Sequence, residues 1–125
     1  MPGGNCRCIS CGKIKPFNQI QAGHYYSRKH MSVRWSEHNV NGECVYCNIY
    51  NGEHLIGYRE NLIAKIGLKS VEFLDVEHRM VRKWSTFEIV EMIKYYGSEL
   101  QFLAASKGVP VSQDVMRVIK KYAKK

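Results

Sequence analysis

Cys8-Ile-Ser-Cys11 and Cys44-Val-Tyr-Cys47 are the two segments around which the first half of this chain must fold. Each Cys-x-x-Cys segment makes a tight turn that directs two sulfur atoms at one ion, and four thiolates close a tetrahedral shell around Zn²⁺ at about 2.3 Å per sulfur. We therefore predict a structural zinc site that joins the two segments and folds the residues between them back as a loop or hairpin. The remaining cysteine, Cys6, is either a free thiol or a competitor of Cys8, and we favour Cys8 because it completes the Cys-x-x-Cys turn.

The bulk composition indicates an intracellular protein with a polyanionic partner. The 125 residues suffice for one domain, and a net charge of +8 with a pI near 9.3 favours nucleic acid, the commonest polyanion inside cells. Secretion with disulfides fits poorly, because no apolar segment of the signal-peptide type opens the chain and the cysteines have metal-ligand spacing. No segment is long enough to span a bilayer, so we expect no membrane partner.

The chain changes character after residue 54. Residues 5–54 indicate short strand-like pieces around the metal, with a strand near Ala22 to Tyr26 and a helix from Val45 onward. Residues 55–125 lack cysteine and show helical periodicity, which predicts a helical extension that packs on the first part or contacts DNA or a second subunit. The expected helices are residues 56–66, ending at Gly67, residues 69–82, one that opens with the capping box Ser85-Thr-Phe-Glu88, and one from Ser112.

The third expected helix carries an apolar stripe. Its members recur at spacings of four and three and so share one face; they are Ile89, Ile93, Tyr96, Leu100 and Leu103. Such a stripe is typical of a core or a subunit contact. A homodimer that uses it as an interface and a monomer that buries it internally both remain open.

Three polar residues between and beside the cysteine pairs resemble a nuclease site. In the HNH, or ββα-metal, nucleases a hairpin carries a general-base histidine and a middle asparagine, and the following helix supplies a metal ligand; His24, Asn39 and Asn48 resemble that set. The resemblance implies an α+β fold in which a small zinc-bound treble-clef module precedes a mostly α-helical C-terminal half. We expect His24 to deprotonate a water molecule, since a neutral imidazole can do so near neutral pH. Asn48 could offer its amide oxygen to a catalytic Mg²⁺ or Mn²⁺, and Asn39 orients the histidine or ties down the loop.

Further candidates lie close to this set in the sequence. His54 is the first candidate for a second ligand of the catalytic cation, with Gln21 and His30 as alternatives. Basic and aromatic residues could hold DNA phosphates, or else form an ordinary solvated surface. These candidate DNA contacts are Tyr25, Arg28, Lys29, Arg34, Lys120 and Lys121.

The chain also resembles one particular family, the NinG (Rap) recombination proteins of lambdoid phages. The resemblance runs in order from about residue 8 to residue 100. It is carried by Cys8-Ile-Ser-Cys-Gly12, Ala22-Gly-His-Tyr25, Arg34-Trp35, His38-Asn-Val40, Cys44-Val-Tyr-Cys-Asn48, Leu55-Ile-Gly-Tyr-Arg59, Ile66-Gly67, His78-Arg79 and Trp84-Ser-Thr86. It implies a structure-specific endonuclease that cuts branched recombination intermediates, such as Holliday junctions and D-loops. It also implies a phage or prophage gene and a place in the host cytoplasm.

The chain departs from the implied pattern at the positions expected to be acidic. Gln21 stands where the family has an acidic residue before Ala-Gly-His, and Gly23 stands where many HNH nucleases have aspartate before the base. The later Gly-Asn of the family is Glu53-His54 here, and imidazole shifts preference toward manganese or another transition metal. The alternative function is a zinc-containing module that binds DNA junctions without cleaving them. A third reading is a restriction or homing nuclease that cuts ordinary duplex.

Overall fold

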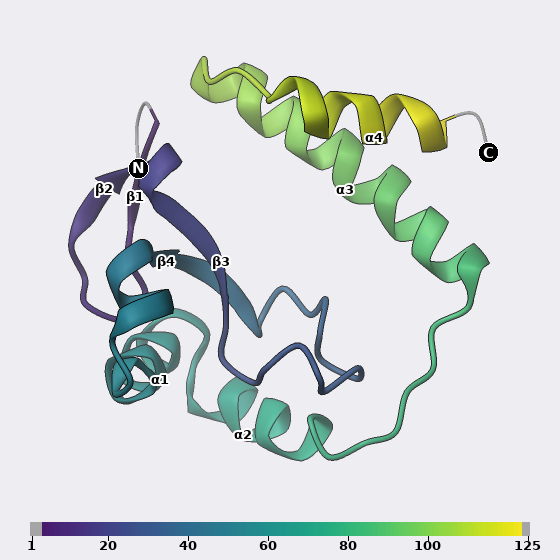
Figure 1. The fold of residues 1–125 in the computed structure, drawn as a ribbon. Coiled ribbons are helices and arrows are strands. Elements are labelled where there is room, and N and C mark those ends of the chain that lie inside the picture. The colour runs from purple at the N-terminus through teal and green to yellow at the C-terminus, as the bar shows by residue number, and fades with distance from the viewer. Residues whose placement is uncertain (1–3, 124–125) are drawn as a thin grey trace. The chain divides into compact units, whose positions relative to one another are not determined.

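The computed structural model describes residues 4–123, and these form two compact units. The first unit is Asn5–Lys83 and holds all the strands and the first two helices; the second begins at Trp84 and holds the last two helices (Figure 1). The expected boundary after residue 54 falls at the start of a helix within the first unit, whose core that helix helps to form. Of the described helices, none has the length and apolar character needed to cross a membrane.

Two antiparallel hairpins build the first half of the first unit. Strand β1 (Asn5–Arg7) pairs with β2 (Ile14–Pro16). A short 3₁₀ turn, η1 (Phe17–Gln19), then leads into β3 (Ile20–His24), which pairs with β4 (Val40–Cys44). The first cysteine pair lies in the β1–β2 connection, where the Cys8 amide donates to the carbonyl of Lys13 over 2.8 Å. The second pair begins at the last residue of β4. The two hairpins therefore carry the two cysteine segments, and the residues between those segments fold back through the β3–β4 hairpin, as the spacing predicted.

Strand β3 begins and ends two residues earlier than the strand expected at residues 22–26. Pairing stops at His24, which lies opposite Val40. The backbone of Tyr26 instead bonds to the side chain of Asn39, whose Oδ1 accepts from the Tyr26 amide over 2.8 Å. A side chain thus replaces the strand ladder at this point, and alternation of residue types alone does not reveal such a replacement.

The helix expected from Val45 is only one π-type turn, η2 (Tyr46–Tyr50). Asn51 is extended, with φ −93° and ψ 99°, and its side-chain oxygen accepts from the Glu53 amide over 3.1 Å. This local side-chain turn competes with continued helix, so the helix α1 begins at His54 and runs to Ile66. Asn48 consequently lies on the turn that follows the metal cluster, and α1 carries His54 as its first residue.

Helices α1 and α2 (Leu68–Glu77) cover the hairpins and supply the core. Tyr58 and Leu62 of α1 pack with Val71 and Leu74 of α2, and all four are essentially inaccessible to solvent. The hydroxyl of Tyr58 donates to the carbonyl of Gly23 over 2.7 Å, which fixes α1 against β3. Gly67, with φ +91°, ends α1 as expected.

Helix α2 is shorter than the expected helix at residues 69–82 and ends at Glu77. The imidazole Nδ1 of His78 bonds to the carbonyl of Asp75, a carbonyl in the last turn of the helix. The ring of His78 also stacks on Tyr26, with ring centroids 3.8 Å apart. These contacts hold the chain after residue 77 against the β3–β4 loop.

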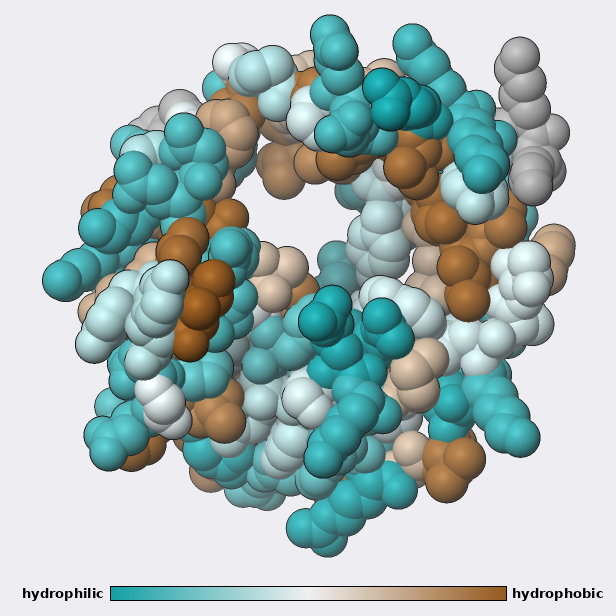
Figure 2. All heavy atoms as spheres, viewed as in Figure 1, coloured by the Kyte–Doolittle hydropathy of each residue, from teal (hydrophilic) through white to brown (hydrophobic). Residues whose placement is uncertain are grey.

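The second unit is a pair of helices. Helix α3 (Thr86–Lys107) opens with the expected capping box of Ser85 and Glu88 and ends at Gly108, whose φ is +66°. Helix α4 (Gln113–Ala123) packs back on α3, and a Cβ at Gly97 would lie 3.2 Å from a side-chain carbon of Ile119. Figure 2 shows hydrophobic side chains gathered along this pair. The apolar stripe of α3 is only partly covered, since Leu103 remains 51% exposed.

Candidate functional site

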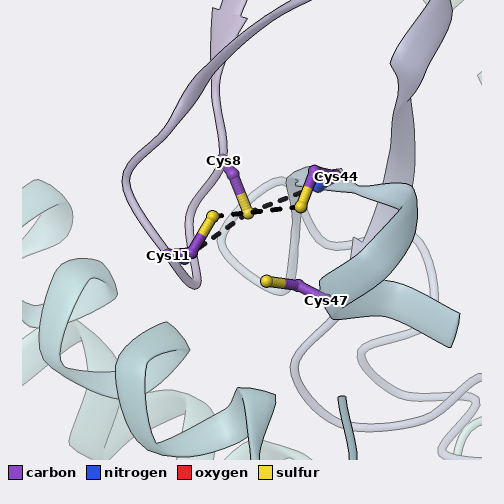
Figure 3. Close-up of side chains that lie close together, drawn as sticks. All are labelled: Cys8, Cys11, Cys44 and Cys47. Atoms are coloured by element: carbon purple, nitrogen blue, oxygen red, sulfur yellow. Dashed lines mark hydrogen bonds between the residues drawn. The ribbon is translucent and has the colours of Figure 1, made fainter. Parts of the chain in front are cut away.

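The four cysteines of the two pairs converge on one point (Figure 3). All four sulfur atoms lie within 4.8 Å of one another, and Cys8, Cys44 and Cys47 are buried while Cys11 is exposed. None of the four forms a disulfide. Cys6 is outside the cluster, and its sulfur contacts the carbonyl of Arg7 instead. The preference for Cys8 over Cys6 is therefore confirmed.

The electrostatics of the cluster suit a bound cation. Burial opposes ionisation of Cys8, but backbone amides, including those of Cys44 and Cys11, lower its pKa to about 7. Burial and the neighbouring sulfurs raise the pKa of Cys47 far above its ordinary value, because a second thiolate beside the first is unfavourable without a positive charge. A divalent ion removes that penalty. The four cysteines could thus hold a metal ion, and the all-sulfur donor set is consistent with structural zinc.

A polar cleft of about 570 Å³ lies beside the metal cluster on the first unit. It contains two histidines and two carboxamides contributed by β3, η2 and α1, together with a basic residue from the β3–β4 loop. Its lining residues are Gln21, Ala22, His24, Ser27, Arg28, Asn48 and His54. The structure thus places His24 and Asn48, the expected base and the expected cation ligand, in one cavity.

His24 is the last residue of β3, and a backbone contact determines its tautomer. Its Nε2 lies 2.9 Å from the carbonyl oxygen of Arg34. A carbonyl oxygen only accepts hydrogen bonds, so Nε2 carries the proton and donates. In the neutral ring the lone pair is then on Nδ1, which is the atom that can accept a proton from water.

Asn48 directly follows Cys47, so the metal cluster fixes where its side chain begins. The amide nitrogen of Asn48 donates to Oε1 of Gln21 over 2.8 Å. That bond uses the donor side of the Asn48 carboxamide and leaves Oδ1 as its acceptor for a cation. Gln21 of β3 is one of the alternative cation ligands. Through this hydrogen bond it orients the side chain of Asn48 on η2.

Sequence reasoning missed Glu43, which backs the wall of the cleft. Its side chain is completely buried, and Oε2 accepts from the hydroxyl of Ser10 and lies 2.5 Å from Nδ1 of His54. Oε1 has no hydrogen-bond partner among the described residues. The only signal in the sequence is a glutamate directly before a metal-ligand cysteine. Its link to His54 and Gly23 becomes visible only with the register of β3 and β4.

Asn39 does not line the cleft but braces the β3–β4 loop. It is completely buried, and its Nδ2 donates to the carbonyls of Tyr26 and Val33 over 2.9 and 3.1 Å, while Oδ1 accepts from the Tyr26 amide. Of the two roles considered for Asn39, these bonds correspond to tying down the loop. They hold the segment that includes Arg34, whose carbonyl orients His24.

The remaining candidates divide between the cleft, the core of the first unit and other parts of the chain. Arg28 lines the cleft, and Lys29 beside it is exposed. Tyr25 packs on Tyr58 with ring centroids 5.3 Å apart, and its hydroxyl accepts a hydrogen bond from Arg59. It is therefore a partly buried residue at the edge of the core. The others lie elsewhere: Arg34 over the Trp35 ring, His30 against Tyr26 and His78, and Lys120 and Lys121 exposed on α4 of the second unit.

A charged cluster fastens the same loop to the helices. Arg59 makes two hydrogen bonds to Asp75, at 3.0 and 2.9 Å, and the Tyr26 hydroxyl donates to Asp75. The Arg59 guanidinium lowers the pKa of Asp75, and burial together with Asp75 raises the pKa of Tyr26 to about 12. Tyr26 is therefore a neutral hydrogen-bond donor throughout the physiological range.

Comparison with known proteins assigns the chain to a protein family. The family model described as "Bacteriophage Lambda NinG protein" matches residues 3–106. The chain belongs to the NinG family. Among NinG relatives, it is 34% identical over 101 residues to "Protein ninG" of Salmonella phage P22, covering 80% of this chain and 49% of that protein.

A second NinG relative, "Protein ninG" of Escherichia phage lambda, is 33% identical over 101 residues, which are 80% of this chain and 48% of that protein. The chain thus spans about half the length of these NinG relatives. No solved structure matches the chain. The NinG match covers the whole first unit, and hence the metal cluster and the cleft.

Proposed function

We propose that this chain is a metal-dependent endonuclease that hydrolyses phosphodiester bonds in branched DNA, with zinc on the four cysteines as a structural element. The observation that carries the proposal is the shared cleft of His24 and Asn48, in which a backbone carbonyl holds His24 with its lone pair on Nδ1. A general base, a possible cation ligand and a basic side chain in one cleft suit the hydrolysis of a phosphodiester, which needs an activated water and charge stabilisation at the phosphate.

Each residue has a defined part in the proposed reaction. His24 Nδ1 takes a proton from water as the water oxygen bonds to phosphorus, the bond from phosphorus to the 3′ oxygen breaks, and the departing oxygen takes a proton from solvent water. Arg28 at the cleft wall binds a phosphate oxygen. Asn48 and His54 would hold a divalent cation, which would neutralise charge at the phosphate and the departing oxygen. The preference for branched DNA rests on the resemblance to phage recombination proteins.

The alternative function is recognition of DNA junctions without cleavage. One observation favours it: none of the described residues that line the cleft carries a carboxylate. Neutral amides bind Mg²⁺ weakly compared with carboxylates. A zinc-held module with Arg28 at the cleft and a net charge of +8 could then bind DNA while lacking a competent cation site.

The test compares cleavage of a labelled four-way junction and a linear duplex by zinc-loaded protein with Mg²⁺ or Mn²⁺. We expect junction cleavage by the wild type and a loss of about 10²–10⁴-fold for His24→Ala. His38→Ala, a change at an exposed histidine outside the cleft, is the matched control and should retain activity. A junction mobility shift without cleavage under either metal would favour the binding module, and equal cutting of linear duplex would contradict the branched-DNA preference.

A further inference from the structure

We propose that Glu43 makes Nε2 of His54 a ligand for a transition-metal cation in the cleft, and that it does so by holding Nδ1 of His54. This inference deepens the proposed nuclease function and rests on the same cleft. It assigns the cation a chemical class, and it gives the buried glutamate a role that the HNH resemblance does not supply.

The contact between the two side chains determines the tautomer of His54. A carboxylate accepts hydrogen bonds and cannot donate them, so Nδ1 of His54 carries the proton that bonds to Glu43 Oε2. The lone pair of the neutral ring is then on Nε2, the other nitrogen of a side chain that is 20% exposed and lines the cleft. Carboxylates that hold metal-binding histidines in this way fix the ring orientation and raise its basicity as a ligand.

Glu43 acts through His54 because it does not reach the cleft. The side chain is completely buried, and its Oε1 faces Gly23, where an added Cβ would lie 2.3 Å away. Gly23 therefore makes room for the carboxylate at the position where the HNH pattern has its own acidic side chain. Glu43 is therefore a positioning residue: it affects the cleft through its hydrogen bond to His54, which fixes the ring and raises its basicity as a ligand.

The unpaired oxygen of Glu43 supports a nearby positive charge. Oε1 is buried without a hydrogen-bond partner among the described residues, whereas Oε2 is bonded to both Ser10 and His54. A buried carboxylate with an unsatisfied oxygen is unfavourable unless a positive charge compensates it. A cation on Nε2 of His54 provides that compensation through the imidazole ring.

The donor set of the cleft determines which cation fits. The protein donor available beside His54 is the amide oxygen of Asn48, because the lone pair of His24 serves as the base, and the described lining contains no carboxylate. Imidazole nitrogen favours first-row transition metals, whereas Mg²⁺ prefers oxygen ligands and carboxylates above all. We therefore expect Mn²⁺ or Co²⁺ to bind more tightly than Mg²⁺.

The experiment measures metal binding without DNA, by calorimetry on the full chain with zinc on the cysteines, while a chromogenic chelator reports any zinc release. The wild type should bind one Co²⁺ or Mn²⁺ more tightly than Mg²⁺. Glu43→Gln should weaken that binding about 10–100-fold, and His54→Ala should weaken it at least as much. Glu37→Gln and His38→Ala, at exposed residues outside the cleft, are the matched controls.

Each outcome decides the inference. It is overturned if Glu43→Gln binds Co²⁺ and Mn²⁺ like Glu37→Gln, or if Mg²⁺ binds at least as tightly as either. Should Glu43→Gln fail to fold, as judged by zinc content and circular dichroism, His54→Ala against His38→Ala provides the same test. Metal binding that depends on Glu43 without any DNA cleavage supports this inference and contradicts the nuclease proposal. Mg²⁺-dependent cleavage that is unaffected by His54→Ala does the reverse.

Discussion

Asn39→Ala should destabilise the first unit by about 3 kcal/mol, because the side chain makes three hydrogen bonds and each contributes roughly 1 kcal/mol. The bonds join Asn39 to the backbone of Tyr26 and Val33 from a completely buried position. Truncation leaves two carbonyls and one amide without their partner. For a unit of this size the loss corresponds to a fall in Tm of about 12–24 °C.

Urea unfolding of the zinc-loaded protein measures this cost. Asn61→Ala is the matched control, because Asn61 is exposed and makes one hydrogen bond, to the carbonyl of Ile9; it should cost about 1 kcal/mol or less. If Asn39→Ala were no more destabilising than Asn61→Ala, the brace that we assign to Asn39 would be refuted.

Asn39→Asp adds a second test with a pH signature. A carboxylate keeps the acceptor for the Tyr26 amide but offers no donor to the two carbonyls, so at neutral pH it should cost more than alanine. Burial beside carbonyls raises the pKa of the new carboxyl group above its unfolded value of about 3.9. Stability should therefore rise as the pH falls through the raised pKa, and no such rise is expected for Asn39→Ala.

Three further changes test other parts of the first unit. Cys44→Ser should abolish stoichiometric zinc binding and unfold the unit, since structural zinc contributes about 10–16 kcal/mol of folding free energy. Metal analysis measures the zinc content of the variant, and circular dichroism measures its unfolding. Gly23→Ala should cost about 1–3 kcal/mol in urea unfolding, because the new Cβ would lie 2.7 Å from the Cβ of Glu43. Asp75→Asn should flatten the acid limb of the stability profile: the lowered pKa of Asp75 adds stability above about pH 4, which is lost as the pH falls through that pKa.

The first two of these changes have a matched control, and the third is compared with the wild type. Cys6→Ser lies outside the cysteine cluster and should keep the zinc, so a zinc-free but folded Cys44→Ser protein would contradict the metal assignment. Gly52→Ala places its Cβ in open space and should be nearly neutral; an equal cost at Gly23 and Gly52 would contradict the contact with Glu43. An unchanged acid limb in Asp75→Asn would show that the pairing with Arg59 contributes nothing to the pH dependence.

Local sequence signals predicted the elements that depend on local chemistry. The two Cys-x-x-Cys segments predicted the metal cluster, and Gly67 and the Ser85 capping box predicted where helices end or begin. The helix ends depend on residues close in the chain, and each half of the metal cluster is a local Cys-x-x-Cys turn. They could be read without knowing which segments pack together.

Most of the features that the sequence did not predict depend on long-range pairing, and one depends on a local side-chain turn. The end of β3 is determined by the side chain of Asn39, and the break after η2 by a local turn at Asn51 that competes with helix. Glu43 gained its meaning only from the register that places it near Gly23 and from α1, which brings His54 to its other oxygen. The alternation of polar and apolar residues carries no information about such partners.

The fastening of the β3–β4 loop has a consequence for diversification of the protein. The loop is secured at its neck by Asn39 and near its middle by Ser32, whose hydroxyl donates to the carbonyl of Glu77. Between Tyr26, which Asn39 holds, and Ser32, residues 27–29 are exposed, and Ser27 and Arg28 border the cleft. Variants at these three positions should therefore change the surface beside the cleft without removing the bonds that hold the loop.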